Sequence, residues 1–364
     1  MPTKYNIHNL IEVIINDSTN KSLTSSIDFH IAELKTGQDE INTCKYQINI
    51  KPYDQFNTSQ FDEINKFHLV EGLSGKLLID KIEKIIYQRN DNGYNIYTDR
   101  SFPIQILIQL LLSRENHAIV HAAALTDQDG NGIILPGPGG VGKTALLGKL
   151  VKEKNYKLLG DDMVIINKND TCLSFPRSFI LKDYHKTVYP DAFLKLELNS
   201  RKKIILPKIT SFINKNAPFI GVAKSILKRF GVFNKIATKL PLPKDFLAAV
   251  PVSSIFGENS IVTQTKIKSI VFLERYTGSK IISVNMTKAS LSKRMFSIIH
   301  HELASYMKLL FSLGSLELED VSMYFSQSKY IMDEFSTNKK ISNLQIPYDC
   351  TPDELYDYFI SEIL

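Results

Sequence analysis

The chain of 364 residues is 43% hydrophobic and 23% charged, with a formal net charge of +6, a composition typical of a globular α/β protein with room for a second module. Its densest apolar stretch, residues 102–112, is too short to cross a bilayer, and we expect neither a membrane segment nor a secretory signal. Three widely spaced cysteines form no pattern typical of a disulfide or metal framework, which favours a reducing, cytoplasmic compartment.

The first hundred residues alternate short apolar runs with polar turns, a pattern typical of β-strands. The runs cover residues 10–15, 27–32, 46–50, 76–79, 85–87 and 94–97. The sequence Asn90-Asp91-Asn92-Gly93 between the last two runs is typical of a tight hairpin turn. We therefore predict a small strand-rich module over residues 1–100.

A larger α/β domain is predicted over residues 101–290, beginning with a helix at 102–114 that carries Pro103 in its first turn. Residues 118–125 and 132–136 predict two strands joined by a tight turn, so we expect them to form a hairpin. The elements expected next are a helix at 143–152, strands at 156–159 and 163–167, and, after an insertion at about 206–260, strands at 269–274 and 280–284.

The C-terminal region, residues 291–364, is predicted to be helical. Helices are expected at 287–313 and 318–335, and a last helix is expected after Thr351, which is a good N-cap and precedes Pro352.

Positive charge is concentrated in one part of the predicted insertion. Between Arg201 and Lys244 there are eleven Lys or Arg residues and no Asp or Glu, whereas the rest of the chain is slightly acidic. A segment like this is usually a solvated face. The alternative is a surface that steers an acidic acceptor, or a lid that closes over a site.

Residues 137–144, with the sequence Gly-Pro-Gly-Gly-Val-Gly-Lys-Thr, complete the G-x-x-x-x-G-K-[ST] pattern of a phosphate-binding loop. Its glycines let the backbone approach a polyphosphate, and the N-terminus of the following helix attracts the anion. In this pattern Lys143 reaches the β- and γ-phosphates, and the Thr144 hydroxyl binds Mg²⁺. We therefore predict that the chain binds a nucleoside triphosphate with Mg²⁺. The predicted contacts are Gly137, Pro138, Gly139, Gly140, Val141, Gly142, Lys143, Thr144 and Ala145.

Two carboxylates and a histidine are expected beside this loop. Asp161 and Asp162 follow the strand at 156–159, and in open α/β sheets the carboxyl ends of strands face the ligand crevice. One carboxylate could hold Mg²⁺ directly or through water, while the other could accept a proton from an attacking hydroxyl. His121 lies 22 positions before Lys143 and is followed by three alanines, whose small side chains leave that surface open.

Together these motifs resemble the catalytic domain of HPr kinase/phosphorylase. They resemble more closely its divergent relatives encoded with peptide-modification pathways, such as lasso-peptide kinases. The resemblance rests on residues 119–123, 133–144 and 158–162, and it covers about 115–170 well and 175–285 loosely. It implies a phosphate-loop nucleotide domain similar to that of phosphoenolpyruvate carboxykinase, within a chain that adds a strand-rich N-terminal module and helical C-terminal elements.

The resemblance also implies roles for individual residues. Lys143 would contact the phosphates, and Asp162 would be the catalytic base. Thr144 would bind Mg²⁺ with the assistance of Asp161, and His121 would lie near the transferring phosphate.

Two departures from the family pattern stand out. HPr kinase has a serine followed by an acidic residue where this chain has Thr144 and Ala145. Its downstream Leu-Glu-x-Arg-Gly signature is only faintly echoed by Leu196-Glu197-Leu198, so we assign no second metal ligand and do not expect HPr to be the acceptor.

We therefore expect an ATP/Mg²⁺-dependent phosphotransferase whose acceptor is an alcohol, first of all a Ser or Thr of a peptide or protein that can be acidic. A kinase of a small-molecule hydroxyl in a biosynthetic pathway and a nucleotide-gated ATPase or switch are the alternatives. The sequence does not decide between ATP and GTP, and it leaves phosphorolysis and a homo-oligomer open. It does not favour a nucleic-acid partner, because the aromatic residues of the basic segment recur at helical spacing.

Overall fold

The computed structural model describes most of the chain. The described ranges are residues 1–16, 21–37, 44–57, 67–72, 75–181, 188–190, 248–337 and 339–364. The basic segment between Arg201 and Lys244, with the predictions made for it, and the sequence Leu196-Glu197-Leu198 lie outside these ranges. Met1–Ser178 and Pro251–Leu364 form one compact unit, and Phe179–Val250 forms a second.

The N-terminal part of the first unit contains a seven-stranded sheet with the order β1-β2-β3-β7-β6-β5-β4. Its strands are β1 (Thr3–Ile7), β2 (Ile11–Ile15), β3 (Tyr46–Lys51), β4 (Phe67–Gly72), β5 (Gly75–Asp80), β6 (Ile85–Asn90) and β7 (Gly93–Thr98). The hairpin predicted at Asn90–Gly93 is confirmed, since these two residues are register partners at the end of β6 and β7.

One predicted strand in this region is wrong. Residues 27–32 lie mostly in helix α1 (Lys21–Ile31), not in a strand. The buried residues Leu23, Ile27 and Ile31 recur at a spacing of four, which is the period of one helix face. The Tyr5 hydroxyl of β1 donates a 2.7 Å hydrogen bond to Asp28 Oδ1 and ties this helix to the sheet.

The second sheet of this unit is mixed and nine-stranded, so the expected α/β class is confirmed. Its main path is β11-β9-β10-β16-β13-β12-β8, and β18 joins β16 to β17 beside it. The strands are β8 (His117–Val120), β9 (Ala122–Thr126), β10 (Asn131–Pro136), β11 (Lys157–Gly160), β12 (Val164–Asn167), β13 (Thr171–Leu173), β16 (Gln264–Tyr276), β17 (Ile282–Asn285) and β18 (Lys340–Pro347).

The strand predicted at 118–125 is divided into β8 and β9 by His121. The β8 half pairs with β12, whereas the β9 half pairs with β10 and β11, so consecutive segments of the chain lie near opposite ends of the sheet path. A buried helix, α2 (Ile104–Arg114), supports this stretch, because Gln109 Oε1 accepts a 2.7 Å hydrogen bond from the backbone of Ile119.

Three strands of this sheet run parallel and end at the same edge. β10 pairs in parallel with β16, and β16 pairs in parallel with β18 over eight residues, Ser269–Tyr276 against Lys340–Pro347. β18 was not predicted from the sequence. The phosphate-binding loop follows β10, so it opens at the edge where β16 and β18 also end.

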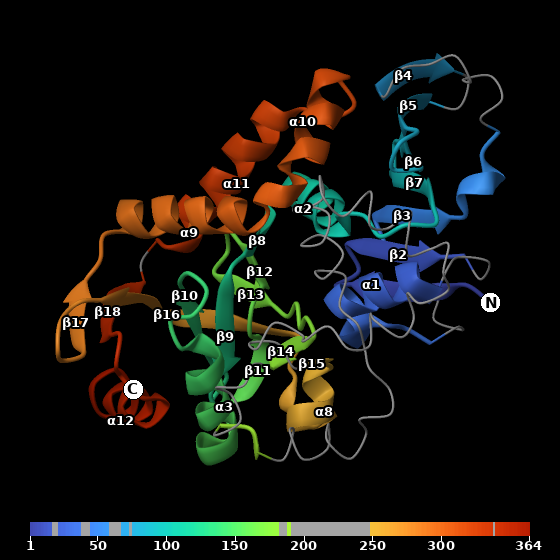
Figure 1. Cartoon of the computed structure of the whole chain (residues 1–364). Helices are drawn as coiled ribbons and strands as arrows, with labels where there is room; N and C mark the ends of the chain where they lie inside the picture. The colour runs from blue at the N-terminus through green and yellow to red at the C-terminus, as the bar shows by residue number, and fades with distance from the viewer. Residues whose placement is uncertain are drawn as a thin grey trace, which may run out of the picture. The chain divides into compact units, whose positions relative to one another are not determined.

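The helices of this unit lie in two groups (Figure 1). α11 packs against α9, α2 and the strands β8 and β12, and α9 and α2 also contact β8, while α12 packs against α3. The bounds are α3 (Lys143–Lys154), α8 (Val252–Phe256), α9 (Lys288–Glu302), α10 (Met307–Ser315), α11 (Val321–Phe335) and α12 (Pro352–Glu362), with short 3-10 turns at Ala32–Leu34, Tyr53–Gln55, Glu258–Ser260 and Ala304–Tyr306.

The single helix predicted at 287–313 is wrong in one respect, because it is interrupted between α9 and α10 by the 3-10 turn Ala304–Tyr306. The interruption lets both α9 and α10 pack against α11. The last helix begins as predicted, with a capping box in which Thr351 and Glu354 satisfy each other's backbone N–H groups.

The second unit contains a two-stranded antiparallel sheet of β14 (Phe179–Leu181) and β15 (Ala248–Val250). The Phe179 and Tyr189 rings meet edge to face with centroids 5.5 Å apart. Across the described residues of both units, no helix is long and apolar enough to cross a bilayer.

A buried carboxylate joins the first sheet to the helices. Glu319, whose side chain is 3% exposed, accepts hydrogen bonds from the guanidinium groups of Arg89 and Arg114 and from the Tyr94 hydroxyl. These partners come from β6, α2 and β7, so one carboxylate connects three elements. Removing one member of this cluster should lower the stability of the fold, because a buried ion without its partner is strongly destabilising.

We expect Glu319→Ala to lower the free energy of unfolding by about 3–5 kcal/mol, since it leaves two arginines without a counter-charge. Glu362→Ala, at an exposed position of α12, should change it by less than about 0.5 kcal/mol. Urea denaturation of the two variants checks this, and equal midpoints would contradict the assigned role.

Candidate functional site

The phosphate-binding loop has the backbone shape that its glycines permit. Gly140 and Gly142 have φ values of +81° and +106°, in the left-handed region that favours glycine. At Gly137 a Cβ atom would lie 2.5 Å from the carbonyl oxygen of Leu273, so β16 passes too close for any side chain. α3 begins at Lys143 directly after Gly142, and the first N–H groups of a helix have no acceptor within it.

The Lys143 ammonium is buried inside the loop, and the residue is 6% exposed. Its Nζ donates to the carbonyl oxygens of Gly137 at 2.7 Å and Pro138 at 2.8 Å, and it lies 3.1 Å from His121 Nε2. These contacts occupy all three donors of the ammonium. Burial lowers its pKa, while the charges of Asp162 and Asp161 oppose that change. A ligand oxygen could therefore reach Nζ only by replacing one of these three acceptors.

Strand direction explains why His121 lies at this edge of the sheet. β9 is antiparallel to β10 and begins opposite Pro136, so the residue that precedes β9 is level with the start of the loop. β11 is antiparallel to β9, hence Asp161 and Asp162, which follow β11, reach the same edge.

The contact with Lys143 fixes the proton on the His121 ring. An ammonium donates and cannot accept, so Nε2 accepts and the neutral ring carries its proton on Nδ1. Nδ1 lies 3.5 Å from Asp162 Oδ1, at the limit of a hydrogen bond, and has no closer partner among the described residues. Burial, together with the charge of Lys143, lowers the pKa of His121, which keeps the ring neutral near pH 7.

Asp161 and Thr144 form a pair of oxygen donors at the start of α3. The Thr144 hydroxyl donates a 2.9 Å hydrogen bond to Asp161 Oδ2, while Asp161 Oδ1 is buried and has no donor among the described residues. Burial, followed by the charge of Asp162, raises the pKa of Asp161 to about 7. Mg²⁺ takes one or two protein oxygens together with phosphate oxygens and water, so this pair fits a Mg²⁺–nucleotide complex. No cluster of three or more His, Cys, Asp or Glu side chains suited to a metal occurs in the described part of the chain.

Asp162 has a partner that sequence reasoning missed. Arg177, whose side chain is 10% exposed, donates to Asp162 Oδ2, and its guanidinium lies 5.1 Å from the centre of the Phe29 ring. The Arg177 Nε atom is buried and has no hydrogen-bond acceptor among the described residues. The sequence Phe175-Pro176-Arg177 matches no motif that indicates a functional arginine, so the contact of Arg177 with Asp162 is seen only in the fold.

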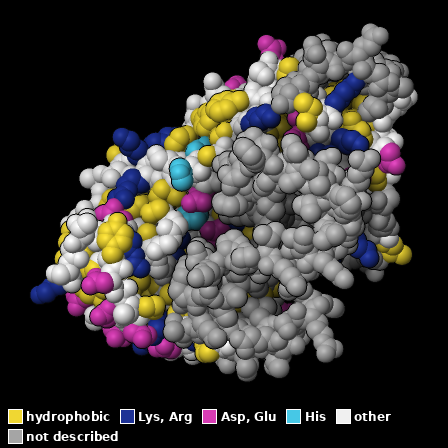
Figure 2. Space-filling model, viewed as in Figure 1, with side chains coloured by type: hydrophobic (Ala, Val, Ile, Leu, Met, Phe, Trp, Pro, Cys, Tyr) yellow, Lys and Arg dark blue, Asp and Glu magenta, His cyan; other side chains and the backbone are white. Residues whose placement is uncertain are grey.

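A further carboxylate, Glu302 at the end of α9, lies close enough for its charge to oppose the lowering of the pKa of both Lys143 and His121. In Figure 2, acidic and histidine side chains lie together over the region of α9. The predicted helix at 287–313 contained this residue, but nothing in the sequence placed it near the loop.

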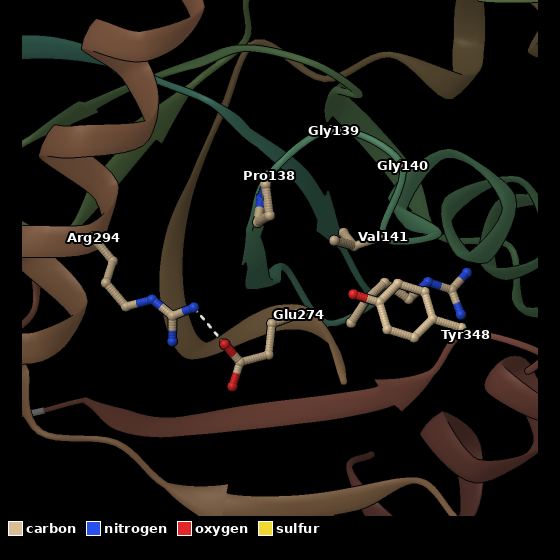
Figure 3. Close-up of a pocket in the computed structure, with 8 residues that line it drawn as sticks. Pro138, Gly139, Gly140, Val141, Glu274, Arg294 and Tyr348 are labelled. Atoms are coloured by element: carbon tan, nitrogen blue, oxygen red, sulfur yellow. Dashed lines mark hydrogen bonds and ion pairs between the residues drawn. The ribbon is translucent and has the colours of Figure 1, made fainter. Parts of the chain in front are cut away.

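The other side of the loop borders a cavity of about 540 Å³. Residues 138–141 form one wall, and Glu274, Arg275, Arg294 and Tyr348 line the rest. Figure 3 shows the Glu274–Arg294 ion pair facing the loop near Pro138, with Tyr348 toward Val141. None of these four side chains was predicted from the sequence, because they come from β16, from α9 and from the residue after β18, which meet only in the fold.

The structure thus brings together His121, Lys143, Thr144, Asp161 and Asp162, as the sequence analysis expected. Ala145 is buried in the first turn of α3, so it can offer a ligand only its backbone N–H. No protein-family model matches the chain, and a search of curated protein sequences gave no match.

The raised pKa of Asp161 predicts a pH-dependent stability. The ordinary value is 3.8 and the folded value about 7, so the folded chain holds this proton to higher pH than the unfolded chain. Stability is therefore lost as pH rises from about 4 to 7. Asp161→Asn, which cannot ionise, should gain about 1–3 kcal/mol relative to wild type between pH 5 and pH 8.

Urea denaturation at the two pH values measures this difference. Asp91→Asn, at an exposed position of the β6–β7 turn, is the matched control and should show no such gain. A gain for Asp161→Asn that is the same at both pH values would refute the assigned pKa.

Proposed function

We propose that this chain is an ATP/Mg²⁺-dependent kinase that transfers the γ-phosphoryl group to a hydroxyl, with Ser or Thr of a peptide or protein as the first acceptor class. The observation that carries this proposal is the convergence of Lys143, the His121–Asp162 pair and the Thr144–Asp161 pair at one edge of the sheet. A phosphate loop alone fits many nucleotide-binding proteins, but a carboxylate beside the lysine adds a proton acceptor for a transfer reaction.

Each residue has a role that follows from its contacts. Lys143 exchanges a loop carbonyl for a phosphate oxygen and stabilises the charge that develops there. Thr144 and Asp161 would hold Mg²⁺, which when bound neutralises phosphate charge. His121 accepts from Lys143 through Nε2 and directs its Nδ1 proton toward Asp162, so it would help to position Lys143.

Asp162 is the proposed base. As the acceptor oxygen forms its bond to the γ-phosphorus, its proton passes to Asp162, and the bond from phosphorus to the bridging oxygen breaks with its electrons remaining on the nucleoside diphosphate. Arg177 donates to Oδ2 of Asp162, and Oδ1 lies on the side of His121; in this proposal the proton passes to Oδ1.

The kinship with HPr kinase and phosphoenolpyruvate carboxykinase is part of the same proposal. It is supported by a phosphate loop that follows a strand of an antiparallel hairpin, by a histidine at the start of that hairpin, and by two carboxylates after the next strand. A nucleotide-gated ATPase would use the same loop, and the experiments below separate it from a kinase.

Lys143→Ala should weaken MgATP binding by about 1.5–3 kcal/mol, the contribution of a hydrogen bond to a charged group, and should reduce turnover. Isothermal titration calorimetry measures the affinity. Lys154→Ala, at the exposed end of the same helix, is the control and should bind like wild type. Unchanged affinity in Lys143→Ala would contradict nucleotide binding at this loop.

Asp162→Asn should lower phosphoryl transfer by about 10²–10⁴, since it keeps the shape but removes the proton acceptor. The assay incubates γ-labelled ATP with a library of Ser- and Thr-containing peptides and counts labelled peptide and free phosphate separately. MgATP binding should survive in this variant. If Asp162→Asn transfers normally and Asp161→Asn is inactive, the two roles are reversed, whereas wild-type release of phosphate without labelled peptide favours an ATPase.

A further inference from the structure

The cavity beside the loop is separated from the proposed base by the strand that carries the loop. β10 lies between β9 and β16 in the sheet. Asp162 follows β11, which pairs with β9, whereas Glu274 and Arg275 lie in β16 and Tyr348 follows β18, which pairs with the far edge of β16. The base and the cavity therefore flank the loop on opposite sides.

In phosphoryl transfer, the two sides of the loop would be occupied by different parts of the reacting complex. The attacking and leaving oxygens lie roughly in line through the γ-phosphorus, so the acceptor and the nucleoside diphosphate approach it from opposite directions. With Asp162 on the side of the acceptor, the nucleoside extends toward the side of β16 and β18. The cavity found there measures about 540 Å³, within the range of small-molecule sites.

The side chains of the cavity suit a nucleoside. Tyr348 is 71% exposed, so its ring face can be covered by a ligand without displacing a packing partner from the core. The Arg275 guanidinium donates to the carbonyl oxygen of Pro347, which fixes the backbone immediately before that ring. A flat base gains free energy by stacking on an aromatic face.

Glu274 supplies the polar part of the cavity. Burial would raise the pKa of its carboxyl, but hydrogen bonds from Arg294, Asn343 and Gln345 outweigh burial and lower it. Oε1 accepts from Asn343 and Gln345, and Oε2 accepts from Arg294, so each oxygen of the ionised carboxylate is oriented by a neighbour. A carboxylate oxygen can accept two hydrogen bonds, and Oε2 has capacity for a hydroxyl donor such as those of ribose.

The geometry points to a nucleoside subsite in this cavity, in which the base stacks on Tyr348 and the ribose hydroxyls donate to Glu274. This inference rests on the proposed function, since it needs a triphosphate held by the loop. It goes further by assigning the direction of the bound nucleotide and the residues that distinguish a nucleotide from a bare polyphosphate.

The experiment compares two probes, MgATP and Mg²⁺-tripolyphosphate, by calorimetry on the full chain. Wild type should bind MgATP more tightly than tripolyphosphate. Tyr348→Ala should weaken MgATP binding about five- to hundred-fold, the range expected for loss of one stacked base, and leave tripolyphosphate affinity unchanged. Tyr348→Phe keeps the ring and should retain MgATP affinity.

Tyr330→Ala removes another exposed tyrosine, in α11, and should bind both probes like wild type. The subsite is refuted if Tyr348→Ala binds MgATP like wild type, if it loses both probes equally, or if wild type does not distinguish them. A wild-type chain that binds neither probe would overturn the proposed function as well, whereas MgATP binding that depends on Lys143 but not on Tyr348 preserves that function alone.

Discussion

A lysine ammonium enclosed by protein needs an acceptor for each of its three protons, and the arrangement of the site follows from how Lys143 meets that need. Two acceptors are carbonyls of its own loop, Gly137 and Pro138, so the loop closes around the side chain that it presents. The third is His121 Nε2, and accepting there commits the ring proton to the side of Asp162. One buried cation thus determines both the closed form of the loop and the tautomer of His121.

The N-terminal sheet region contributes to this site through few contacts. His8 lies 2.6 Å from the carbonyl oxygen of Ser174, and Phe29 of α1 covers the guanidinium of Arg177 while its own carbonyl accepts from the backbone of Ser178 at 3.0 Å. Because Arg177 in turn holds Asp162, the strand-rich region reaches the proposed base through two side chains. A cation over an aromatic face in a poorly hydrated position is worth about 0.5–2 kcal/mol, enough to bias where the guanidinium rests.

Local patterns predicted the hairpin, the loop, its helix and the two aspartates, because each depends on residues close together in the sequence. The turn from β10 into α3 requires positive φ values at positions 140 and 142, and the sequence shows directly that both residues are glycine. Arg177 and Tyr348 could not be predicted, because each is brought to the site by contacts between segments that are distant in the sequence. β18 was not predicted either, because its place in the sheet depends on pairing with β16. Residues 27–32 were misread as a strand because β-branched and aromatic residues there also fit the period of a helix face.

The pairing of β14 with β15 has a consequence for how the chain folds. Leu181 and Ala248 are register partners although they lie far apart in the sequence. An unfolded chain loses entropy when it brings such distant residues together, and this loss precedes any gain from the contact. The β14–β15 ladder is therefore expected to form later in folding than the β6–β7 hairpin, whose partners are close together in the sequence.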